Sequence, residues 1–390
     1  MERYLSSSIP KAASVYSQDK MLPTLFSPAH LDACFAADYA GAHARFRHAC
    51  DRHEHSGYRE FVYRQTGPDK EKLVTATAWL GNKNASRVLV LQSATHGVEG
   101  FCGSAIQVDC LDYFIESKLP DDLAILFIHA LNPHGFAWLR RVNEDGIDLN
   151  RNFVDFNQPL PVNEGYRTLA KDILPESESE FAAASERLKL KQQEMGRVAY
   201  EKAMSGGQYE FADGLFYGGQ SASQSRLYLE EIFHAYQLHK RKKIAVLDFH
   251  TGLGPFGYGE AICDHPPGSA GVKWAKRVYG DSVTEPALGS SSSVPKLGLV
   301  DYFWQESLGD RVCFITLEFG TYAIENLFEV LRHDHLLHRQ ALKWNDRKTQ
   351  KVKQAISNHF YPATVDWQEM VLCRGRQVIQ QAINGLQESS

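Results

Sequence analysis

The chain has 390 residues, of which 43% are hydrophobic and 23% are charged, and both fractions are ordinary for a folded globular protein. Its formal net charge of −5 at pH 7 argues against nucleic acid or an anionic membrane as the main partner. A chain of this length can form two domains, but it is also typical of a large α/β enzyme with one domain and an insertion.

Cysteine usage indicates the compartment. Seven cysteines occur without a C-x-x-C pair, and an odd number leaves at least one of them unpaired. Free thiols in a reducing compartment fit this usage better than a disulfide framework. The first twenty residues lack the apolar core of a signal peptide, and no apolar run approaches the length of a membrane span. We therefore expect a cytoplasmic protein.

The N-terminal part of the chain predicts a helix followed by a β-hairpin. Ser27 and Pro28 form a typical helix start, and the residues after them predict one helix that continues to about Arg52. Residues 58–65 and 73–80 alternate apolar and polar side chains around a Gly-Pro-Asp turn. This alternation predicts an antiparallel pair at one edge of a sheet.

Four apolar runs farther along the chain predict strands that are buried on both faces, as in a parallel sheet. They are residues 88–91, 124–130, 244–249 and 312–317. Helices are expected over 103–117 and 272–279, and a short strand near 261–262. We predict an α/β fold with a mixed, mainly parallel central sheet of about eight strands and helices on both faces.

The remaining segments are expected to decorate a single domain, 1–390. Residues 157–240 are polar and charge-dense, which predicts a helical insertion that caps or flanks the site. Residues 323–390 predict a helical C-terminal tail in three pieces. Three histidines of the first piece are expected at the surface: His333, His335 and His338. The serine-rich stretch 289–295 has the composition of a loop that moves.

Potential metal ligands occur where three of the predicted strands end. His96 and Glu99 follow the first strand, His250 ends the third, and Glu318 ends the fourth. The carboxyl ends of parallel strands form the edge where such sheets bind ligands. Each residue also has an ordinary interpretation, because H-x-x-E should occur roughly once by chance in a chain with 16 histidines. His250 alone is equally typical of a core histidine, and Glu318 of a buried carboxylate paired with an arginine.

The combination of these residues has a chemical rationale. Catalytic zinc commonly takes two His and one Glu and leaves a position for water, whose pKa it lowers to about 7. A nearby carboxylate can carry the proton of that water to the leaving amine, and an arginine can stabilise the oxyanion. A second arginine can grip a substrate carboxylate in a bidentate pair. The loop at 140–153, RRVNEDGIDLNRNF, supplies arginines of this kind.

The order of the motifs resembles the zinc carboxypeptidase superfamily, including its metallocarboxypeptidases and its aspartoacylase/succinylglutamate desuccinylase branch. The motifs are H-x-x-E, N-P-x-G-F, R-x-N-x-x-G-x-D-L-N-R-N-F, D-F-H and T-L-E-F-G, over about residues 85–325. D-L-N-R-N-F is the most specific of them. The resemblance implies one Zn²⁺ per chain, held by His96, Glu99 and His250, with Glu318 as general base and acid.

The resemblance also implies roles for the arginine-rich loop. Arg141 matches the residue that polarises the scissile carbonyl, and Arg140 is the neighbouring alternative. Asn150 and Arg151 match the pair that holds the carboxylate of the substrate. Asp148 matches the carboxylate that orients the first metal-bound imidazole.

Three functions follow from these expectations. The first is zinc-dependent hydrolysis of an amide bond next to a free carboxylate, as a carboxypeptidase on small peptides. The second is deacylation of an N-acyl amino acid, and the third is zinc binding without turnover. The stretch 289–295 lacks the tyrosine that closes over the substrate in digestive carboxypeptidases, which weakens the case for a conventional exopeptidase. The sequence does not indicate an oligomeric state.

Overall fold

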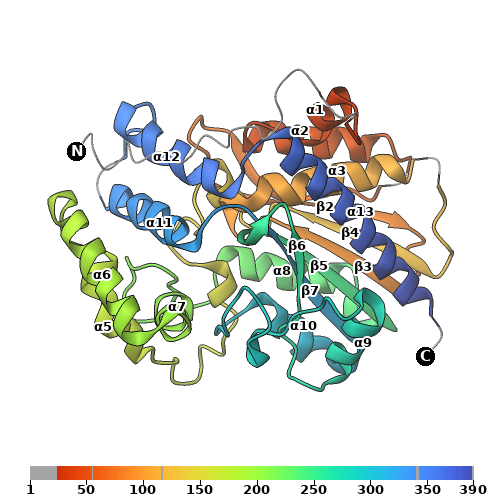
Figure 1. The fold of residues 1–390 in the computed structure, drawn as a ribbon. Coiled ribbons are helices and arrows are strands. Elements are labelled where there is room, and N and C mark those ends of the chain that lie inside the picture. Colours follow the sequence, from red (N-terminus) through yellow and green to blue (C-terminus); the bar gives the residue numbers. More distant parts are fainter. Residues whose placement is uncertain (1–23, 55, 116, 340–341, 389–390) are drawn as a thin grey trace.

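The structure is a computed structural model that describes residues 24–54, 56–115, 117–339 and 342–388. At its centre lies a seven-stranded sheet with the order β1-β2-β4-β3-β5-β7-β6 (Figure 1). The strands are β1 (Arg59–Thr66), β2 (Lys72–Gly81), β3 (Arg87–Ser93), β4 (Leu123–His129), β5 (Lys243–Phe256), β6 (Gly259–Ile262) and β7 (Val312–Gly320). Strands β4, β3, β5 and β7 are parallel, whereas β2 and β6 pair antiparallel with them. The predicted mixed, mainly parallel sheet is confirmed, with seven described strands.

The buried strands divide their side chains between two hydrophobic cores, one on each face of the sheet. In β3, Leu89 and Leu91 belong to one core, and Val88 and Val90 belong to the other. The first core is completed by α1 (Pro28–Cys34), α2 (Tyr39–Asp51), α3 (Gly100–Tyr113), α9 (Ala270–Tyr279) and α13 (Val365–Gln387). The second is completed by α8 (Gln224–Ala235) and α10 (Val300–Leu308). Burial of each such side chain contributes about 2 kcal/mol, so apolar runs of this kind favour the interior of a covered sheet.

The single N-terminal helix predicted from the sequence is wrong, because the chain forms two helices there. Helix α1 ends at Cys34 and α2 begins at Tyr39. The side chain of Asp38 accepts a hydrogen bond from the N–H of Gly41 and caps the second helix. An aspartate in this capping position stabilises a new helix start better than it stabilises a helix interior.

A third group of helices lies beside the sheet, to the left in Figure 1. It contains α5 (Glu164–Ile173), α6 (Phe181–Met195), α7 (Arg197–Ser205), α11 (Ile324–His338) and α12 (Arg347–Phe360). These helices share a smaller hydrophobic core that includes Tyr166, Met204 and Leu331. Segment 157–240 therefore contributes both to this group and, through α8, to the face of the sheet. The prediction that segment 157–240 is an insertion is not tested by these contacts.

The C-terminal tail forms three helices, α11, α12 and α13, in agreement with the prediction. The surface position predicted for the histidines of α11 is wrong. His335 is 6% exposed, and the side chains of His333 and His338 are only 25% and 18% exposed. Helix α11 packs against α12 on one side and against the core shared with α5–α7 on the other, so few of its positions face solvent.

Shorter elements complete the described chain. They are α4 (Pro133–Ala137), η1 (Gly97–Glu99), η2 (Leu149–Arg151), η3 (Glu178–Glu180), η4 (Leu238–Lys240), η5 (Pro286–Leu288) and η6 (Gly309–Arg311). Within residues 24–388, apart from the gaps at 55, 116 and 340–341, no helix combines the length and the apolar character needed to cross a membrane.

Candidate metal centre

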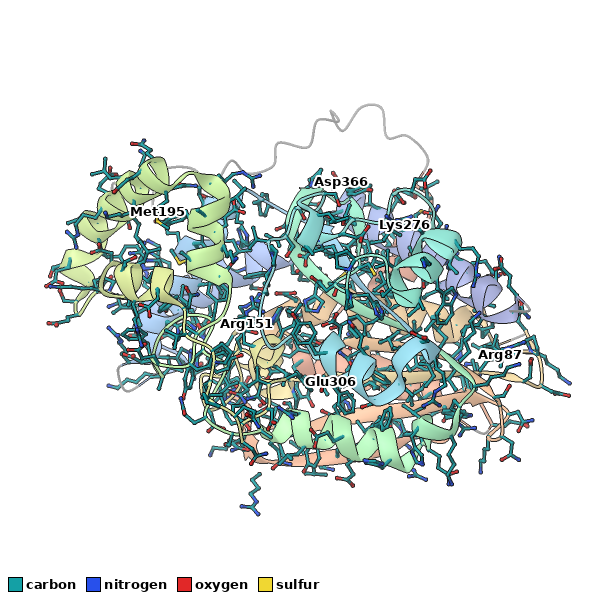
Figure 2. All side chains as sticks on the ribbon, turned by 90° about the horizontal axis from the view of Figure 1, so that it is seen from below. Arg87, Arg151, Met195, Lys276, Glu306 and Asp366 are labelled. Carbon is teal, nitrogen blue, oxygen red and sulfur yellow. The ribbon has the colours of Figure 1, made fainter. Side chains whose placement is uncertain are left out.

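The predicted metal ligands meet at the carboxyl edge of the sheet. His96 lies just before η1 and Glu99 lies at its end, so both follow β3 closely, and His250 lies on β5. Glu318 lies on β7, where it is the register partner of His250. In Figure 2, Arg151 lies near this edge, between the helices α5–α7 and the sheet, whereas Arg87, at the start of β3, lies far from it. The edge at which the strands end therefore carries the site.

Four ligand atoms converge at the centre of the site. The Nδ1 atom of His96 lies 2.9 Å from Oε1 of Glu99, and Nδ1 of His250 lies 3.0 Å from Oε2 of Glu99. The two Nδ1 atoms are 3.1 Å apart. All three side chains are buried. Burial by itself raises the pKa of Glu99, but the charges of His96 and His250 and their hydrogen bonds lower it far below its usual value.

A second layer of carboxylates fixes the orientation of both imidazoles. Nε2 of His96 lies 3.1 Å from Oδ1 of Asp148, and Nε2 of His250 lies 2.8 Å from Oδ2 of Asp248. A carboxylate at Nε2 favours a proton on that nitrogen and leaves the lone pair of Nδ1 directed at the centre. The contact of Asp148 agrees with its predicted place beside the first imidazole. The sequence analysis assigned no role to Asp248. Its D-x-H spacing on a strand nevertheless puts it on the same face as His250.

The two neighbouring arginines, Arg140 and Arg141, bind different partners. Nη1 of Arg141 donates to Oε1 of Glu99 at 3.1 Å, and its Nε donates to Oδ2 of Asp148 at 3.0 Å. Arg140 instead points away from the centre, and its Nε donates to Oδ2 of Asp334 on α11 at 2.9 Å. Of these two arginines, only Arg141 lines the pocket that contains the centre.

The backbone of this arginine loop also holds the turn that carries the candidate ligands His96 and Glu99. The N–H of Gly97 donates to the carbonyl of Arg141 at 3.2 Å, and the N–H of Val98 donates to the carbonyl of Arg140 at 2.8 Å. A Cβ atom at Gly97 would lie 2.0 Å from the carbonyl carbon of Gly135. A side chain at position 97 is therefore excluded, and the glycine allows the turn to pack directly on α4.

Glu318 has the environment of a proton acceptor that is poised near neutral pH. It is 6% exposed, and its Oε1 accepts a hydrogen bond from the N–H of Leu253 at 3.0 Å. Burial, and next the negative charge of Glu99, raise the pKa of Glu318 to about 7. Near neutral pH such a carboxyl group populates both its protonated and its ionised forms.

Asn150 and Arg151 lie on the wall of the same pocket. Arg151 is fully buried, and its Nη1 and Nη2 donate to the main-chain oxygens of Asn150 at 2.6 Å and Ser205 at 2.8 Å. Its Nε has no hydrogen-bond partner among the described residues. The side-chain oxygen of Asn150 accepts from the N–H of Val300 at 2.8 Å. The guanidinium group of Arg151 is thus held by neutral oxygens, and no carboxylate of the described residues forms an ion pair with it, although the nearby charge of Asp148 raises its pKa against the effect of burial.

One pocket contains the candidate ligands His96, Glu99 and His250 together with Arg141, Asn150, Arg151 and Glu318. Its wall also includes residues that sequence reasoning missed: Glu201, Ser205, Phe216, Asp264, Ser292 and Lys296. Glu201, Ser205 and Phe216 lie in segment 157–240, which was predicted to cap or flank the site, and Ser292 lies in the serine-rich stretch, but no motif marked the individual residues. None of the described residues on this wall is a tyrosine.

The serine-rich loop at 289–295, which was expected to move, is tied to the sheet. Oε1 of the buried Glu260 on β6 accepts hydrogen bonds from Oγ1 of Thr284 at 2.5 Å, Oγ of Ser291 at 2.8 Å and the N–H of Ser292 at 3.1 Å. Motion of this loop stays a prediction, but its first half is anchored in the described structure.

The fold and the site define an α/β protein with a buried histidine–carboxylate centre at the carboxyl edge of its sheet. The chain belongs to the family described as "Protein of unknown function (DUF2817)", whose model matches residues 35–374. No curated protein matches the chain.

Several solved structures are similar to the chain at low identity. Carboxypeptidase A from Helicoverpa armigera is 14% identical, with 89% of this chain and 73% of that chain covered and a TM-score of 0.43. An aspartoacylase family protein from Mesorhizobium loti is 13% identical, with 72% and 65% covered and a TM-score of 0.35. Murein-tripeptide amidase MpaA from Escherichia coli O157 is 14% identical, with 83% and 100% covered and a TM-score of 0.35. Because these similarities are weak, the proposals below depend on the side chains of this chain.

Proposed function

We propose that this chain is a zinc-dependent hydrolase that cleaves an amide bond next to a free carboxylate, as a carboxypeptidase on small peptides. The observation that carries the proposal is the convergence of His96, Glu99 and His250 in a pocket that also contains Glu318 and Arg151. These side chains supply metal ligands, a proton acceptor and a cation for a carboxylate.

The donor set fits one zinc ion per chain. Two imidazoles and one carboxylate are common ligands of catalytic zinc, and outer carboxylates on the imidazoles are typical of such sites. Two Nδ1 lone pairs 3.1 Å apart also repel each other unless a proton or a cation lies between them. When bound, zinc would polarise a carbonyl oxygen and lower the pKa of a water molecule to about 7.

Glu318 and Arg141 are suited to the chemical step. With a pKa of about 7, Glu318 can accept a proton from the attacking water and donate it to the leaving nitrogen. The guanidinium group of Arg141 is held beside Glu99 by Asp148, where it can stabilise negative charge that develops on the carbonyl oxygen.

Arg151 and Asn150 are suited to holding the free carboxylate of the substrate. A buried guanidinium group without a carboxylate partner has lost its hydration, and a substrate carboxylate restores the missing charge partner. This feature favours substrates with a free carboxylate next to the scissile amide over internal peptide bonds.

The second candidate is deacylation of an N-acyl amino acid, of the aspartoacylase or succinylglutamate desuccinylase type. Glu201 and Ser205 of α7 form part of the pocket wall, so segment 157–240 narrows the space around the reacting bond. A narrow pocket favours small substrates, and the metal ligands and Arg151 serve both reactions equally.

We also propose a cytoplasmic location. All seven cysteines are free and six of them are buried. Buried thiols in this number fit a reducing compartment, where they stay unpaired.

The deciding experiment measures metal content and activity on one purified batch. The substrates are matched peptides with free or amidated C-termini and a set of N-acyl amino acids, each tested with and without a chelator. About one zinc per chain and chelator-sensitive cleavage only of substrates with a free carboxylate are expected. Peptide or acyl preference then selects the first or second candidate. A zinc-loaded protein that cleaves none of them supports zinc binding without turnover, and failure to bind zinc contradicts the proposal.

A further inference from the structure

A second group of potential metal ligands lies outside the pocket. His30 and Cys34 lie on α1, and Asp109 lies on α3. One ligand atom from each of these three side chains lies within 4.8 Å of the other two. None of the three residues lines the pocket of the proposed function, so that function leaves the group unexplained.

The three ligand atoms face one another. His30 and Cys34 are four residues apart on a helix, which puts both side chains on the same face. Nε2 of His30 lies 3.6 Å from Sγ of Cys34 and 2.7 Å from Oδ1 of Asp109. A nitrogen at about 2.0 Å and a sulfur at about 2.3 Å from a tetrahedral zinc ion lie about 3.5 Å apart. The spacing of His30 and Cys34 therefore already suits such an ion.

Asp109 can bind a metal ion and keep its arginine partner. Nε of Arg376 on α13 donates to Oδ2 of Asp109 at 2.7 Å, and Nη2 donates to Oδ1 at 2.6 Å. A carboxylate offers about four acceptor positions, so Oδ2 can keep Nε of Arg376 while Oδ1 binds a metal ion. The side chain of Arg376 is 42% exposed, which lets its second donor turn to solvent. Carboxylates that bind metals are commonly held by an outer hydrogen bond of this kind.

The site has one side open to solvent. Cys34 and Asp109 are buried, whereas His30 is half-buried. The ring of Phe26 stacks on that of His30 at 5.4 Å and helps to orient the imidazole. An ion can therefore enter beside His30 and keep a water molecule as its fourth ligand.

We propose that His30, Cys34 and Asp109 bind a second zinc ion, which fastens α1 to α3. Thiolate, imidazole and carboxylate groups are all ligands that zinc accepts. The thiol must lose its proton on binding, and burial, and next the charge of Asp109, raise the pKa of Cys34 to about 12. The centre of the proposed function therefore fills first, and the second site begins to fill only above the zinc concentrations that saturate that centre.

The test titrates cobalt(II) into metal-free protein and records the thiolate-to-cobalt charge-transfer band in the near ultraviolet. The centre of the proposed function contains no thiolate, so cobalt bound there does not produce this band. The variants are Cys34→Ser and His30→Gln. Cys50→Ser, at a buried free cysteine of α2, is the matched control.

The wild type and Cys50→Ser should bind a second equivalent of cobalt, and the band should rise with that equivalent alone. Cys34→Ser should abolish the band. His30→Gln should raise the Kd of the second equivalent at least about 100-fold, because loss of an outer partner alone costs about 10- to 100-fold. Zinc added afterwards should remove the band by displacing the cobalt. No band in the wild type, or equal bands in Cys34→Ser and Cys50→Ser, would overturn the inference. If Cys34→Ser does not fold, His30→Gln, at a half-buried position, decides in the same way.

Hydrogen exchange tests the role of the ion. The second equivalent of zinc should slow amide exchange in α1 of the wild type but not of His30→Gln. A band without slower exchange would overturn the fastening of α1 to α3.

A final comparison separates this inference from the proposed function. His30→Gln should cleave substrates at a rate within about twofold of the wild type, because His30 lies outside the pocket. His250→Ala should lose the first equivalent of cobalt and keep the band. A band without any cleavage would support the second site and contradict the proposed function, whereas cleavage without a band would do the reverse.

Discussion

Each histidine of the centre uses its two ring nitrogens for different tasks. The Nε2 atoms of His96 and His250 face Asp148 and Asp248, and the Nδ1 atoms face Glu99. The outer carboxylates therefore determine the tautomer, and the tautomer determines which lone pair is available to a metal ion. The hydroxyl group of Thr95 donates a hydrogen bond to Oδ1 of Asp248 at 2.9 Å and thereby helps to orient this carboxylate.

At the residue scale, replacement of Glu318 by glutamine tests its role as the proton carrier. Glu318→Gln keeps the shape of the side chain but removes the group that accepts a proton, so kcat should fall by at least about 100-fold. Zinc content should stay near that of the wild type, because Glu318 is not one of the proposed ligands. Activity at the wild-type rate on every substrate would show that another residue is the base.

At the scale of elements, a buried ionic cluster ties the arginine-rich loop to the C-terminal helices. Asp334 on α11 is 1% exposed and accepts from Arg140 at 2.9 Å and from Nζ of Lys353 on α12 at 2.5 Å. Lys353 also contacts Nε2 of His338 at 2.8 Å. Since the backbone of Arg140 holds the turn that carries His96 and Glu99, the two helices help to fix that turn.

Asp334→Asn tests this connection. Loss of the carboxylate leaves the charges of Arg140 and Lys353 buried without a partner, which should lower the free energy of unfolding by about 3–5 kcal/mol. Urea unfolding measures the change, and Glu329→Gln, at a position of α11 that is 54% exposed, should change it by less than about 0.5 kcal/mol. Equal effects of the two variants would contradict a structural role for the cluster.

At the scale of the whole molecule, a bound metal ion would join distant segments of the chain. His250 follows His96 by 154 residues and Glu99 by 151 residues, so the ligand set exists only when the sheet is formed. Metal binding should therefore stabilise the folded state alone, by about 4 kcal/mol when free zinc exceeds the Kd a thousandfold. Calorimetry should record a higher Tm with zinc than with chelator for the wild type, and no difference for His250→Ala. A Tm that is the same with zinc and with chelator in both proteins would contradict the proposed zinc site.

Much of the sheet was predictable because its strands carry local signals. The β1–β2 hairpin follows from alternation around a turn, and β3, β4, β5 and β7 follow from continuous apolar runs. The break between α1 and α2 and the burial of His335 were missed. The break has a local signal in Asp38, which caps α2. The burial of His335 depends on what packs around α11, and a short window of sequence does not contain that information.

By itself, the sequence determined the ligand types and their order along the chain: His96, Glu99, His250 and Glu318 all follow or end a buried strand, and parallel strands align such ends at one edge. Only the tertiary structure decided between the neighbouring arginines, because the choice depends on Asp334, 194 residues from Arg140. It alone brought Asp264 and Lys296 to one pocket with Arg151. Local patterns specify elements and donor chemistry, whereas charge balance in a pocket is a property of segments that meet only after the chain has folded.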